Sequence, residues 1–361
     1  MGMMNRSHFS SRLLPYTVTT AGKETVVNSS MFMSSGDAIK SSIRITISVF
    51  LVTAAIFGLV GSVLVLYFMK TKKVTNSFLR GISFQKNFNF YIKSLATSDI
   101  LSSLISVTVT VISLLSDSHS IQSGWGCKAT MYFIILFPTI TMSNLLVLSI
   151  EKYLSTRSAP RTLKFSTVKK LVLFAWLEGC LIVCFPAATF DGVRYSVNDT
   201  HYTVICRYNN HYLPSRLIYS IFVILQIILP MVIMIIINIS LIKTVWRRIY
   251  RMSVDVQRDN GIKLKVRAAA VRSTNILVAI TFAFILPYFF YVCQVIYNNV
   301  TKAKLHYETD YVIRAEGATL AMTNPAVNFI LYLTQMKDFC AFVKRLFARS
   351  PAPNLNQIAM V

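Results

Sequence analysis

The sequence SLATSD at residues 94–99 places a carboxylate inside an apolar segment that runs from about residue 90 to 115. A transmembrane helix needs roughly 20 apolar residues, and six further segments of this kind are residues 43–69, 128–150, 170–189, 216–242, 273–297 and 312–334. With 54% hydrophobic and only 14% charged residues, the chain is too apolar for a soluble domain. We therefore predict an all-α membrane protein, built as a seven-transmembrane helix bundle.

The basic residues indicate how the seven spans are oriented. Most of the 37 lysines and arginines fall in the loops after spans one, three and five and in the tail after span seven. Because cationic loops are retained in the cytoplasm, we predict a plasma-membrane protein with an extracellular N-terminus and a cytoplasmic C-terminus. The net charge of +23 is interrupted by the spans and biased to one face. It therefore favours membrane lipid and a protein partner over nucleic acid.

This topology divides the chain into three parts. Residues 1–42 are predicted to form an extracellular, glycosylated N-terminus, which we expect to be disordered. Residues 43–335 are predicted to form the seven-transmembrane domain, and residues 336–361 a cytoplasmic eighth helix with a short tail. Glycan acceptors of the form Asn-x-Ser/Thr must face the lumen. Four of them fall on predicted outer segments: Asn5, Asn28, Asn198 and Asn299.

Polar and conformationally special residues follow one another through the spans in a fixed order. The series is Asp99, Cys127, Glu151-Lys152-Tyr153, Trp176, Cys206, Pro230, Leu286-Pro287-Tyr288 and Asn328-Phe329-Ile330-Leu331-Tyr332. It resembles the pattern of a rhodopsin-like (class A) G-protein-coupled receptor, and the resemblance covers roughly residues 43–347. What it implies for each residue is an expectation, to be compared with the structure.

The resemblance implies a disulfide between Cys127 and Cys206, which folds the second outer loop across the mouth of the bundle. Both cysteines lie on the predicted outer side, where the environment is oxidising. Past span seven, apolar residues alternate with Lys344 and Arg345 in an amphipathic pattern typical of an interfacial helix. This segment resembles the family's short eighth helix, and Cys340 is a candidate for palmitoylation.

Asp99 needs a reason to lie in mid-span, because a buried carboxylate is unfavourable there unless it is solvated or paired. It could be purely a hub of structural hydrogen bonds. In the family that the chain resembles, this aspartate anchors a sodium ion, and Thr141, Asn324 and Asn328 offer oxygen atoms that suit such a hard cation. We favour an allosteric sodium site, or proton sensing, over a purely structural role. No other cofactor is expected.

Span seven admits two alignments with the family's motif. Asn324 and the proline after it resemble the start of Asn-Pro-x-x-Tyr, but Asn328 would then replace the tyrosine. The longer form Asn-Ser-x-x-Asn-Pro-x-x-Tyr instead retains Asn328 as the second asparagine and Tyr332 as the tyrosine, with Phe329 in the usual place of proline. An Asn-Phe-x-x-Tyr ending resembles FMRFamide-type and related invertebrate neuropeptide receptors.

Glu151, Lys152 and Tyr153 resemble the Asp/Glu-Arg-Tyr switch at the cytoplasmic end of span three, which with Tyr332 implies contact with a heterotrimeric G protein. Lysine keeps the charge but lacks the planar fork of arginine. The inner end of span six offers no acidic partner. We therefore expect Glu151 and Lys152 to hold the resting state alone, with some basal activity.

Two prolines resemble the family's helix kinks in spans five and six, Pro230 and Pro287. In the family, span six swings outward during activation. Ile285 replaces the family's tryptophan in that span, and the first inner loop, from about Lys70 to Phe88, is longer than the family's short turn. These departures concern the activation mechanism more than the fold.

The expected ligand pocket lies in the outer half of the bundle. Ile134 stands where amine receptors carry an aspartate, and span seven has no lysine for a retinal Schiff base, with Met322 at that position; these residues argue against an amine or light receptor. Aromatic residues such as Tyr208, Tyr288 and Tyr291 line the predicted mouth, and Glu316 could pair with an arginine of a peptide. A neuropeptide is the favoured ligand, with a lipid or small organic molecule next.

The sequence thus predicts a receptor that converts binding of an extracellular ligand into G-protein activation. A transporter or channel would show an inverted repeat or several intramembrane charges, and an enzyme would bring a nucleophile and a base together on one membrane face; neither pattern is found. A weakly signalling receptor partner stays open because Lys152 and Ile285 depart from the family. Glu178 in span four faces either a helix partner or lipid headgroups.

Overall fold

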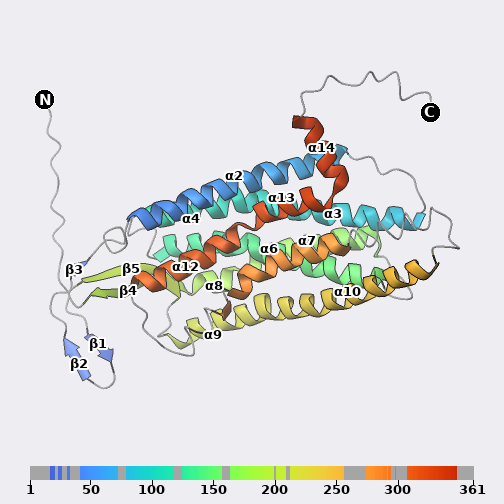
Figure 1. The fold of residues 1–361 in the computed structure, drawn as a ribbon. Coiled ribbons are helices and arrows are strands. Elements are labelled where there is room, and N and C mark those ends of the chain that lie inside the picture. Colours follow the sequence, from blue (N-terminus) through green and yellow to red (C-terminus); the bar gives the residue numbers. More distant parts are fainter. Residues whose placement is uncertain are drawn as a thin grey trace.

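A computed structural model of the chain describes residues 17–20, 23–26, 31–32, 41–71, 79–116, 124–156, 163–198, 201–208, 212–255, 274–290, 292–293, 297 and 307–347. Within these residues, long helices lie side by side in one bundle (Figure 1). A small β-sheet lies at one end of the bundle, and a short helix crosses the other end.

All seven predicted spans are helical in the described residues. The first four are α2 (Ser41–Thr71), α3 (Leu79–Leu101) continued through the π-helix η1 (Ser102–Ser106) into α4 (Val107–Leu115), α6 (Gly124–Thr156), and α7 (Phe165–Ile182) with α8 (Cys184–Ala188). The others are α9 (Leu213–Val223) continued through the π-helix η2 (Ile224–Ile228) into α10 (Leu229–Asp255), the helix Thr274–Phe290, and α12 (Tyr307–Met322) with α13 (Asn324–Gln335). Five of these spans are long and apolar enough to cross a membrane, and Thr274–Phe290 is apolar but shorter.

The helices extend beyond the apolar segments that predicted them. Helix α3 already begins at Leu79, so the first inner loop is shorter than the expected segment from Lys70 to Phe88. Polar residues such as Asn87 hid this start from the hydropathy pattern, yet Asn87 is buried in the bundle. Helices longer than the bilayer core need not be apolar at their ends.

The β-sheet adds to the predicted all-helical architecture. Strands β4 (Phe190–Asn198) and β5 (His201–Tyr208) form an antiparallel hairpin between spans four and five, and β3 (Met31–Phe32) pairs in parallel with the start of β5. A separate hairpin consists of β1 (Thr17–Thr20) and β2 (Lys23–Val26). The expectation of a disordered N-terminus is therefore wrong for these strands. The threonine and valine residues of β1 and β2 favour an extended backbone.

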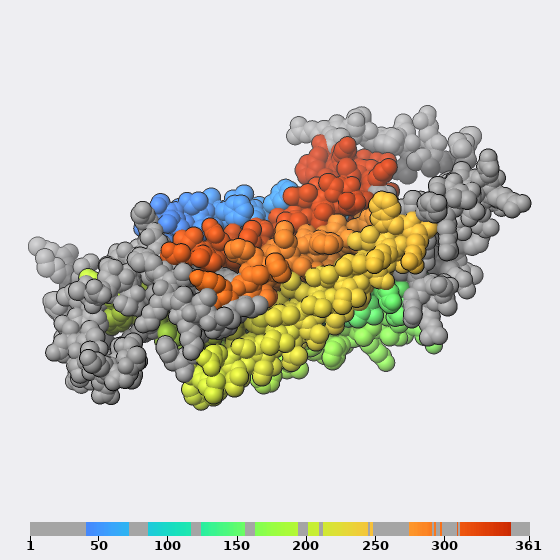
Figure 2. Space-filling view, turned by 60° about the horizontal axis from the view of Figure 1, so that its bottom comes forward, coloured from blue at the N-terminus to red at the C-terminus, as the bar shows by residue number. Residues whose placement is uncertain are grey.

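Spans five and six run along one face of the bundle. Figure 2 shows the yellow spheres of α9 to α10 beside the orange helix Thr274–Phe290, and the same two segments are neighbours in Figure 1. Many of the side chains on α9 to α10 are apolar and exposed, including Ile221, Leu225, Val232 and Ile236. Such a surface is suited to contact with lipid chains.

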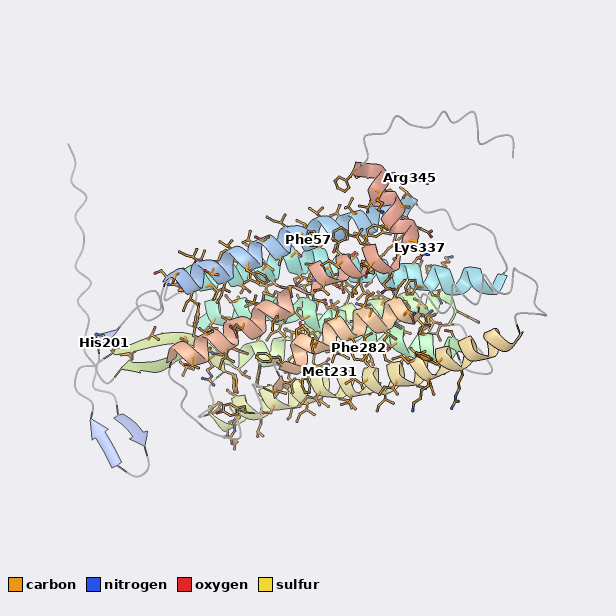
Figure 3. The ribbon with its side chains drawn as sticks, viewed as in Figure 1. Phe57, His201, Met231, Phe282, Lys337 and Arg345 are labelled. Carbon is orange, nitrogen blue, oxygen red and sulfur yellow. A yellow bond between two sulfur atoms is a disulfide. The ribbon has the colours of Figure 1, made fainter. Side chains whose placement is uncertain are left out.

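Helix α14 (Lys337–Phe347) packs against spans one and seven. Its Phe339 is fully buried, and the Phe339 ring lies 5.3 Å from that of Phe68 on α2 and 6.2 Å from that of Phe329 on α13. Lys337 and Arg345 mark the two ends of this helix in Figure 3, while His201 marks the sheet at the opposite end. The helix lies where the sequence predicts the eighth helix, and its aromatic side holds it to the bundle.

Two glycines let spans one and seven approach closely. A Cβ atom on Gly58 would lie 2.7 Å from the Cβ of Pro325, and one on Gly61 would overlap the side chain of Phe329. Phe329 also stacks edge-on against Phe57, with ring centroids 5.1 Å apart. In a membrane, where lipid chains are as apolar as leucine, such close packing of small residues is a main source of helix association.

Substitution of Gly61 by alanine should therefore destabilise the receptor. Overpacking a tight core costs about 1–3 kcal/mol, so Gly61→Ala is expected to lower the melting temperature and the surface level. Val60→Ala is the matched control, because Val60 is exposed on the lipid side of the same helix. Equal melting temperatures for the native protein and Gly61→Ala would contradict the close contact with Phe329.

Candidate functional site

Asp99 forms a buried link between spans two and seven. The side chain of Asp99 is 2% exposed, and the Nδ2 atom of Asn328 donates a hydrogen bond to its Oδ2 atom at 3.0 Å. This contact requires the alignment of span seven in which Asn328, rather than Asn324, is the second asparagine of the motif. The carboxylate thus has a partner on another helix, as a polar group in hydrocarbon requires.

The other predicted members of this polar hub are placed less directly. The hydroxyl of Thr141 on α6 pairs with that of Ser98, the neighbour of Asp99, at 2.9 Å. Asn324 lies one turn before Asn328 on α13, is buried, and has an Oδ1 atom without a hydrogen-bond partner in the described part of the chain. Of the predicted hub residues, Asn328 therefore contacts Asp99 directly, and Thr141 contacts its neighbour Ser98.

A second polar junction lies near the C-terminal end of span three, where Glu151 and Lys152 are both buried. The Nδ2 atom of Asn87 on α3 donates to Glu151 Oε1 at 2.6 Å and to the carbonyl of Leu163 at 2.9 Å. The Nζ atom of Lys152 lies 5.7 Å from the ring centroid of Phe88, within the range of a cation–π contact. Two consecutive residues of span two therefore contact the two consecutive charged residues of the switch.

This junction corrects one expectation. We expected Glu151 and Lys152 to hold the resting state alone, but Asn87 holds Glu151 from span two. The sequence concealed this partner, because Asn87 fell in the expected inner loop. Tyr153 is partly buried against the core of the bundle, and Tyr332 is fully buried there, with a hydroxyl that has no hydrogen-bond partner among the described residues.

The Asn87 contact predicts a stability difference between two buried asparagines. Asn87→Ala removes the amide that donates to Glu151 Oε1, and loss of a partner to a buried polar group costs about 1–3 kcal/mol. Asn238 on α10 is the matched control, because it is equally buried and its amide has no partner in the described residues. In purified receptor, Asn87→Ala should lower the melting temperature clearly more than Asn238→Ala. Equal losses would contradict the contact.

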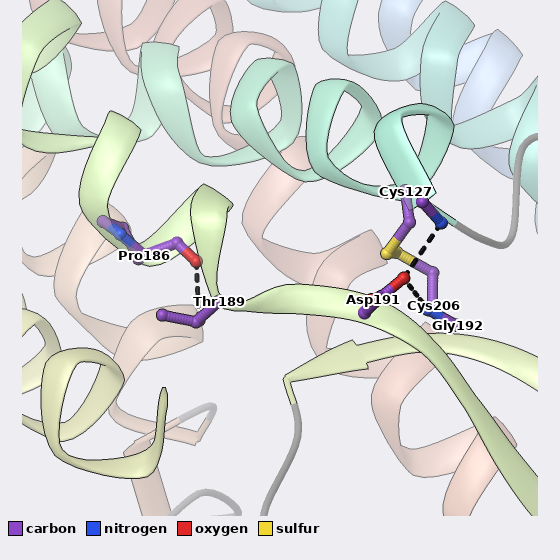
Figure 4. The surroundings of a disulfide bond; sticks show 7 residues. Cys127, Pro186, Thr189, Asp191, Gly192 and Cys206 are labelled. Atoms are coloured by element: carbon purple, nitrogen blue, oxygen red, sulfur yellow. Dashed lines mark hydrogen bonds between the residues drawn. A yellow bond between two sulfur atoms is a disulfide. The ribbon is translucent and has the colours of Figure 1, made fainter. Parts of the chain in front are cut away.

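A disulfide ties the β-hairpin to the end of the bundle at which the sheet lies. Cys127, near the start of α6, is bonded to Cys206 on β5, with an S–S distance of 2.00 Å (Figure 4). This is the pair that the resemblance implied. Beside it, the carboxylate of Asp191 on β4 accepts hydrogen bonds from the backbone N–H groups of Gly124, at 2.9 Å, and Gly192, at 2.8 Å. Both strands of the hairpin are thus fastened to the beginning of span three.

The hairpin also rests on an aromatic cluster. The rings of Tyr208 on β5 and Tyr219 on α9 stack with centroids 4.3 Å apart, and the Phe190 ring meets the Tyr219 ring edge-on at 5.6 Å. Tyr208 was expected to line the ligand mouth, but its side chain is buried in this cluster. Tyr208 therefore supports the sheet from within the bundle.

The three predicted pocket residues that the structure describes lie in different surroundings. Ile134 on α6 packs with Leu51, Val107 and Met322, whereas Tyr288 is buried in the main core, with its ring stacked 4.6 Å from that of Phe284. The side chain of Glu316 on α12 is exposed. Tyr291 lies outside the described residues.

The remaining predicted positions fall as follows. Pro230 is the second residue of α10, just after the π-helix η2, and Pro287 lies within the helix Thr274–Phe290. Cys340 is half-buried on α14. Asn198 is the last residue of β4, at the turn of the hairpin, while Asn5, Asn28 and Asn299 lie outside the described residues.

Span four is tied to spans two and three by a network that the sequence motif only hinted at. The Nε1 atom of Trp176 donates to Ser94 Oγ at 3.0 Å, and Ser94 Oγ donates to Asn144 Oδ1 at 3.3 Å. Trp176 was part of the quoted series, but Ser94 and Asn144 were not assigned a role. Serine and asparagine in a transmembrane helix are a sequence signal for interhelical hydrogen bonds.

Comparisons with known proteins agree with this architecture. The family model of the 7 transmembrane receptor (rhodopsin family) matches residues 63–332. Melanopsin of Podarcis siculus is 27% identical over 172 residues, which are 41% of this chain and 33% of that protein. This alignment therefore spans about a third of the length of the relative. The crystal structure of squid rhodopsin superposes with a TM-score of 0.69 and 17% identity, covering 88% of this chain and 85% of that chain.

The seven helices, the disulfide-tied hairpin and the buried polar junctions are those of a seven-transmembrane receptor. The chain belongs to the rhodopsin family, since the family model covers most of its length. The predicted class A resemblance and the seven-helix fold are thereby confirmed, and the chain is a multi-pass plasma-membrane receptor rather than an enzyme. The structural likeness to squid rhodopsin, at 17% identity, concerns the fold alone.

Proposed function

We propose that this receptor converts the binding of an extracellular peptide into activation of a heterotrimeric G protein. The observation that carries the proposal is the presence of two features at opposite ends of the helix bundle. At one end, a sheet fastened by the Cys127–Cys206 disulfide lies over the helices. At the other end, Glu151 and Lys152 occupy the family's switch position, in contact with span two.

The distribution of charge supports a cytoplasmic location for the end of the bundle that carries α14. The exposed basic residues on the helix ends there include Lys70, Lys243, Lys337, Lys344 and Arg345. Cationic segments are retained on the cytoplasmic side and attract anionic lipid headgroups. This orientation makes the N-terminus and the sheet extracellular, and places the glycan acceptor Asn198 at the outer tip of the hairpin. Cys340 then lies on α14 at the inner membrane surface, where it could be palmitoylated.

The chemistry of the bundle supports a ligand other than an amine or retinal. Melanopsin and squid rhodopsin, the two similar proteins described above, are opsins by name. In this chain, however, span seven from Tyr307 to Gln335 contains no lysine for a Schiff base. Met322 stands at that position, packed in one apolar cluster with Ile134, Leu51 and Val107. Because Ile134 stands where amine receptors carry an aspartate, this cluster offers no carboxylate to a ligand amine.

A peptide suits the outer sheet because extended chains bind to exposed strand edges. Strand β5 is central in the order β3-β5-β4, so β4 presents an edge without a neighbour among the described strands. The Asn-Phe-x-x-Tyr ending of span seven, which resembles FMRFamide-type receptors, points to the same class of ligand. Glu316 and Tyr291 stay candidates for contacts with such a peptide.

The proposal includes an allosteric sodium ion at Asp99. The residues present fit this ion, because Asn324 and Asn328 each have a buried side-chain oxygen without a hydrogen-bond partner in the described residues. Asp99 would supply the negative charge, and the two amide oxygens and the Thr141 hydroxyl would supply further oxygen ligands, which a hard cation prefers. The ion would stabilise the arrangement in which spans two and seven are joined.

Sodium dependence of stability tests this part of the proposal. Purified receptor should melt at a higher temperature in sodium chloride than in choline chloride at equal ionic strength, since a ligand that binds the folded state stabilises it. Asp99→Asn and Asn324→Ala should lose this difference, while Asn238→Ala should keep it. A sodium effect of equal size in Asp99→Asn would remove the ion from this site.

Signalling is tested with a G-protein dissociation assay in cells, using a panel of Gα subunits and a library of amidated neuropeptides. We expect a saturable response that Cys127→Ser abolishes, because the outer sheet loses its covalent attachment to span three. Cys184→Ser is the matched control, since Cys184 is a free, exposed cysteine, and it should respond as the native receptor does.

Silence across the panel, with normal surface levels, would contradict the peptide proposal. Weight would then shift to a lipid or small-molecule agonist, or to a weakly signalling receptor partner. The partner alternative rests on Lys152, which replaces the family's arginine and lies buried over Phe88.

A further inference from the structure

Glu178 on α7 is an acidic side chain in the middle of span four. It lies in a segment whose neighbours Phe174, Leu177 and Leu181 are exposed apolar residues on the lipid side. A carboxyl group at this depth is unfavourable unless other groups satisfy it. Glu178 is separate from the Asp99 hub and from the Glu151 switch, and the proposed function assigns it no role.

Both oxygens of Glu178 have partners on other helices. The hydroxyl of Ser143 on α6 donates to Oε2 at 2.9 Å, and the Nε2 atom of Gln226 on η2 donates to Oε1. One side chain of span four therefore links spans three and five. Because each carboxyl oxygen already accepts a hydrogen bond within this chain, the structure itself satisfies the polar group.

A close approach of spans three and four brings these groups together. Gly179, the residue after Glu178, faces Ile140, and a Cβ on this glycine would lie 2.6 Å from Ile140 Cγ1. Ile140 is three residues, or nearly one helical turn, before Ser143. The absence of a side chain at 179 thus allows the backbone of span four to come close enough for Glu178 to reach Ser143.

Gln226 occupies a special place in span five. It is the central and only polar residue of the π-helix ILQII at 224–228. Pro230 lies four residues later, so it has no N–H group to donate to the Gln226 carbonyl, and its ring would clash with that carbonyl in a regular α-helix. The π-helical turn avoids this clash, and the hydrogen bond to Glu178 fixes where the turn lies.

We propose that Glu178 is a positioning residue that anchors the π-helical turn of span five, through Gln226, against spans three and four. If the turn reverted to regular α-helix, the extra residue that it holds would take a place of its own, and the following helix would rotate by about 100° relative to the preceding one. Helix α10 carries the span onward to Lys243 and Arg247 at its inner part. The anchor therefore sets the rotation of the inner half of span five, and its link to signalling rests on the proposed function.

The test measures the position of span five directly. Nitroxide labels are attached at Lys169→Cys on α7 and Lys243→Cys on α10, two exposed positions, in receptor reconstituted in lipid nanodiscs. The four free cysteines Cys180, Cys184, Cys293 and Cys340 are first replaced by serine. Pulsed electron resonance then gives the distribution of distances between the two labels.

With the anchor intact, we expect a single narrow distribution. Glu178→Leu and Gln226→Leu should shift or broaden it, because each leaves the turn without its hydrogen bond. Glu178→Gln keeps the length of the side chain and one acceptor oxygen for Gln226, so this variant should retain a near-native distance distribution. Leu225→Ala is the matched control, since Leu225 lies on the exposed side of the same turn, and it should leave the distances unchanged.

Native distances in Gln226→Leu, or an equal shift in Leu225→Ala, would overturn the proposal. If Glu178→Leu does not fold, Glu178→Gln and Ser143→Ala still test the anchor, with Ser143→Ala expected to cause a smaller shift. These distances need neither ligand nor G protein. A shift in distance without any change in basal G-protein activation would therefore support the anchor and count against the proposed function.

Discussion

The absence of water in the bilayer core constrains this structure more than any other factor. A polar side chain in a transmembrane helix is stabilised by a partner on another helix, and several buried links of this kind join the helices of the chain. Asp99 joins Asn328, Asn87 joins Glu151, Trp176 joins Ser94, and Glu178 joins Gln226. Interhelical hydrogen bonds in membranes contribute only about 0.6 kcal/mol on average. Their main effect here is therefore to fix which helix faces meet.

Close packing provides the complementary contribution, and it acts where the polar links do not reach. Gly58 and Gly61 admit Pro325 and Phe329 from span seven, and Gly179 admits Ile140 from span three. Phe329 stands where the family has proline, while the proline lies four residues earlier, at the break between α12 and α13. The helix therefore breaks just before Pro325, and the ring of Phe329 lies between spans one and seven at the position where the family has proline.

The sequence was sufficient to predict the architecture because its strongest signals are long apolar segments and a specific order of polar residues. The same order placed Asn328 among three expected companions of Asp99, and the family resemblance implied the pairing of Cys127 with Cys206. Partners that belong to no motif could not be predicted: Asn87 lay outside the apolar segment, and Glu178 could equally have faced lipid. The burial of Tyr208 was also hidden, because an aromatic residue in an outer loop suits a ligand mouth as well as a supporting cluster. These outcomes depend on tertiary contacts that no local pattern encodes.

The central claim is that span seven is aligned so that Asn328 contacts Asp99. The most direct test exchanges the two side chains and compares the melting temperatures of Asp99→Asn, Asn328→Asp and the double exchange in purified receptor without sodium. If the two residues are in contact, each single variant loses stability and the double exchange recovers much of it, because the acid–amide pair is restored in reverse. A double exchange whose loss equals the sum of the two single losses would show that the residues act independently, and would contradict this alignment of span seven.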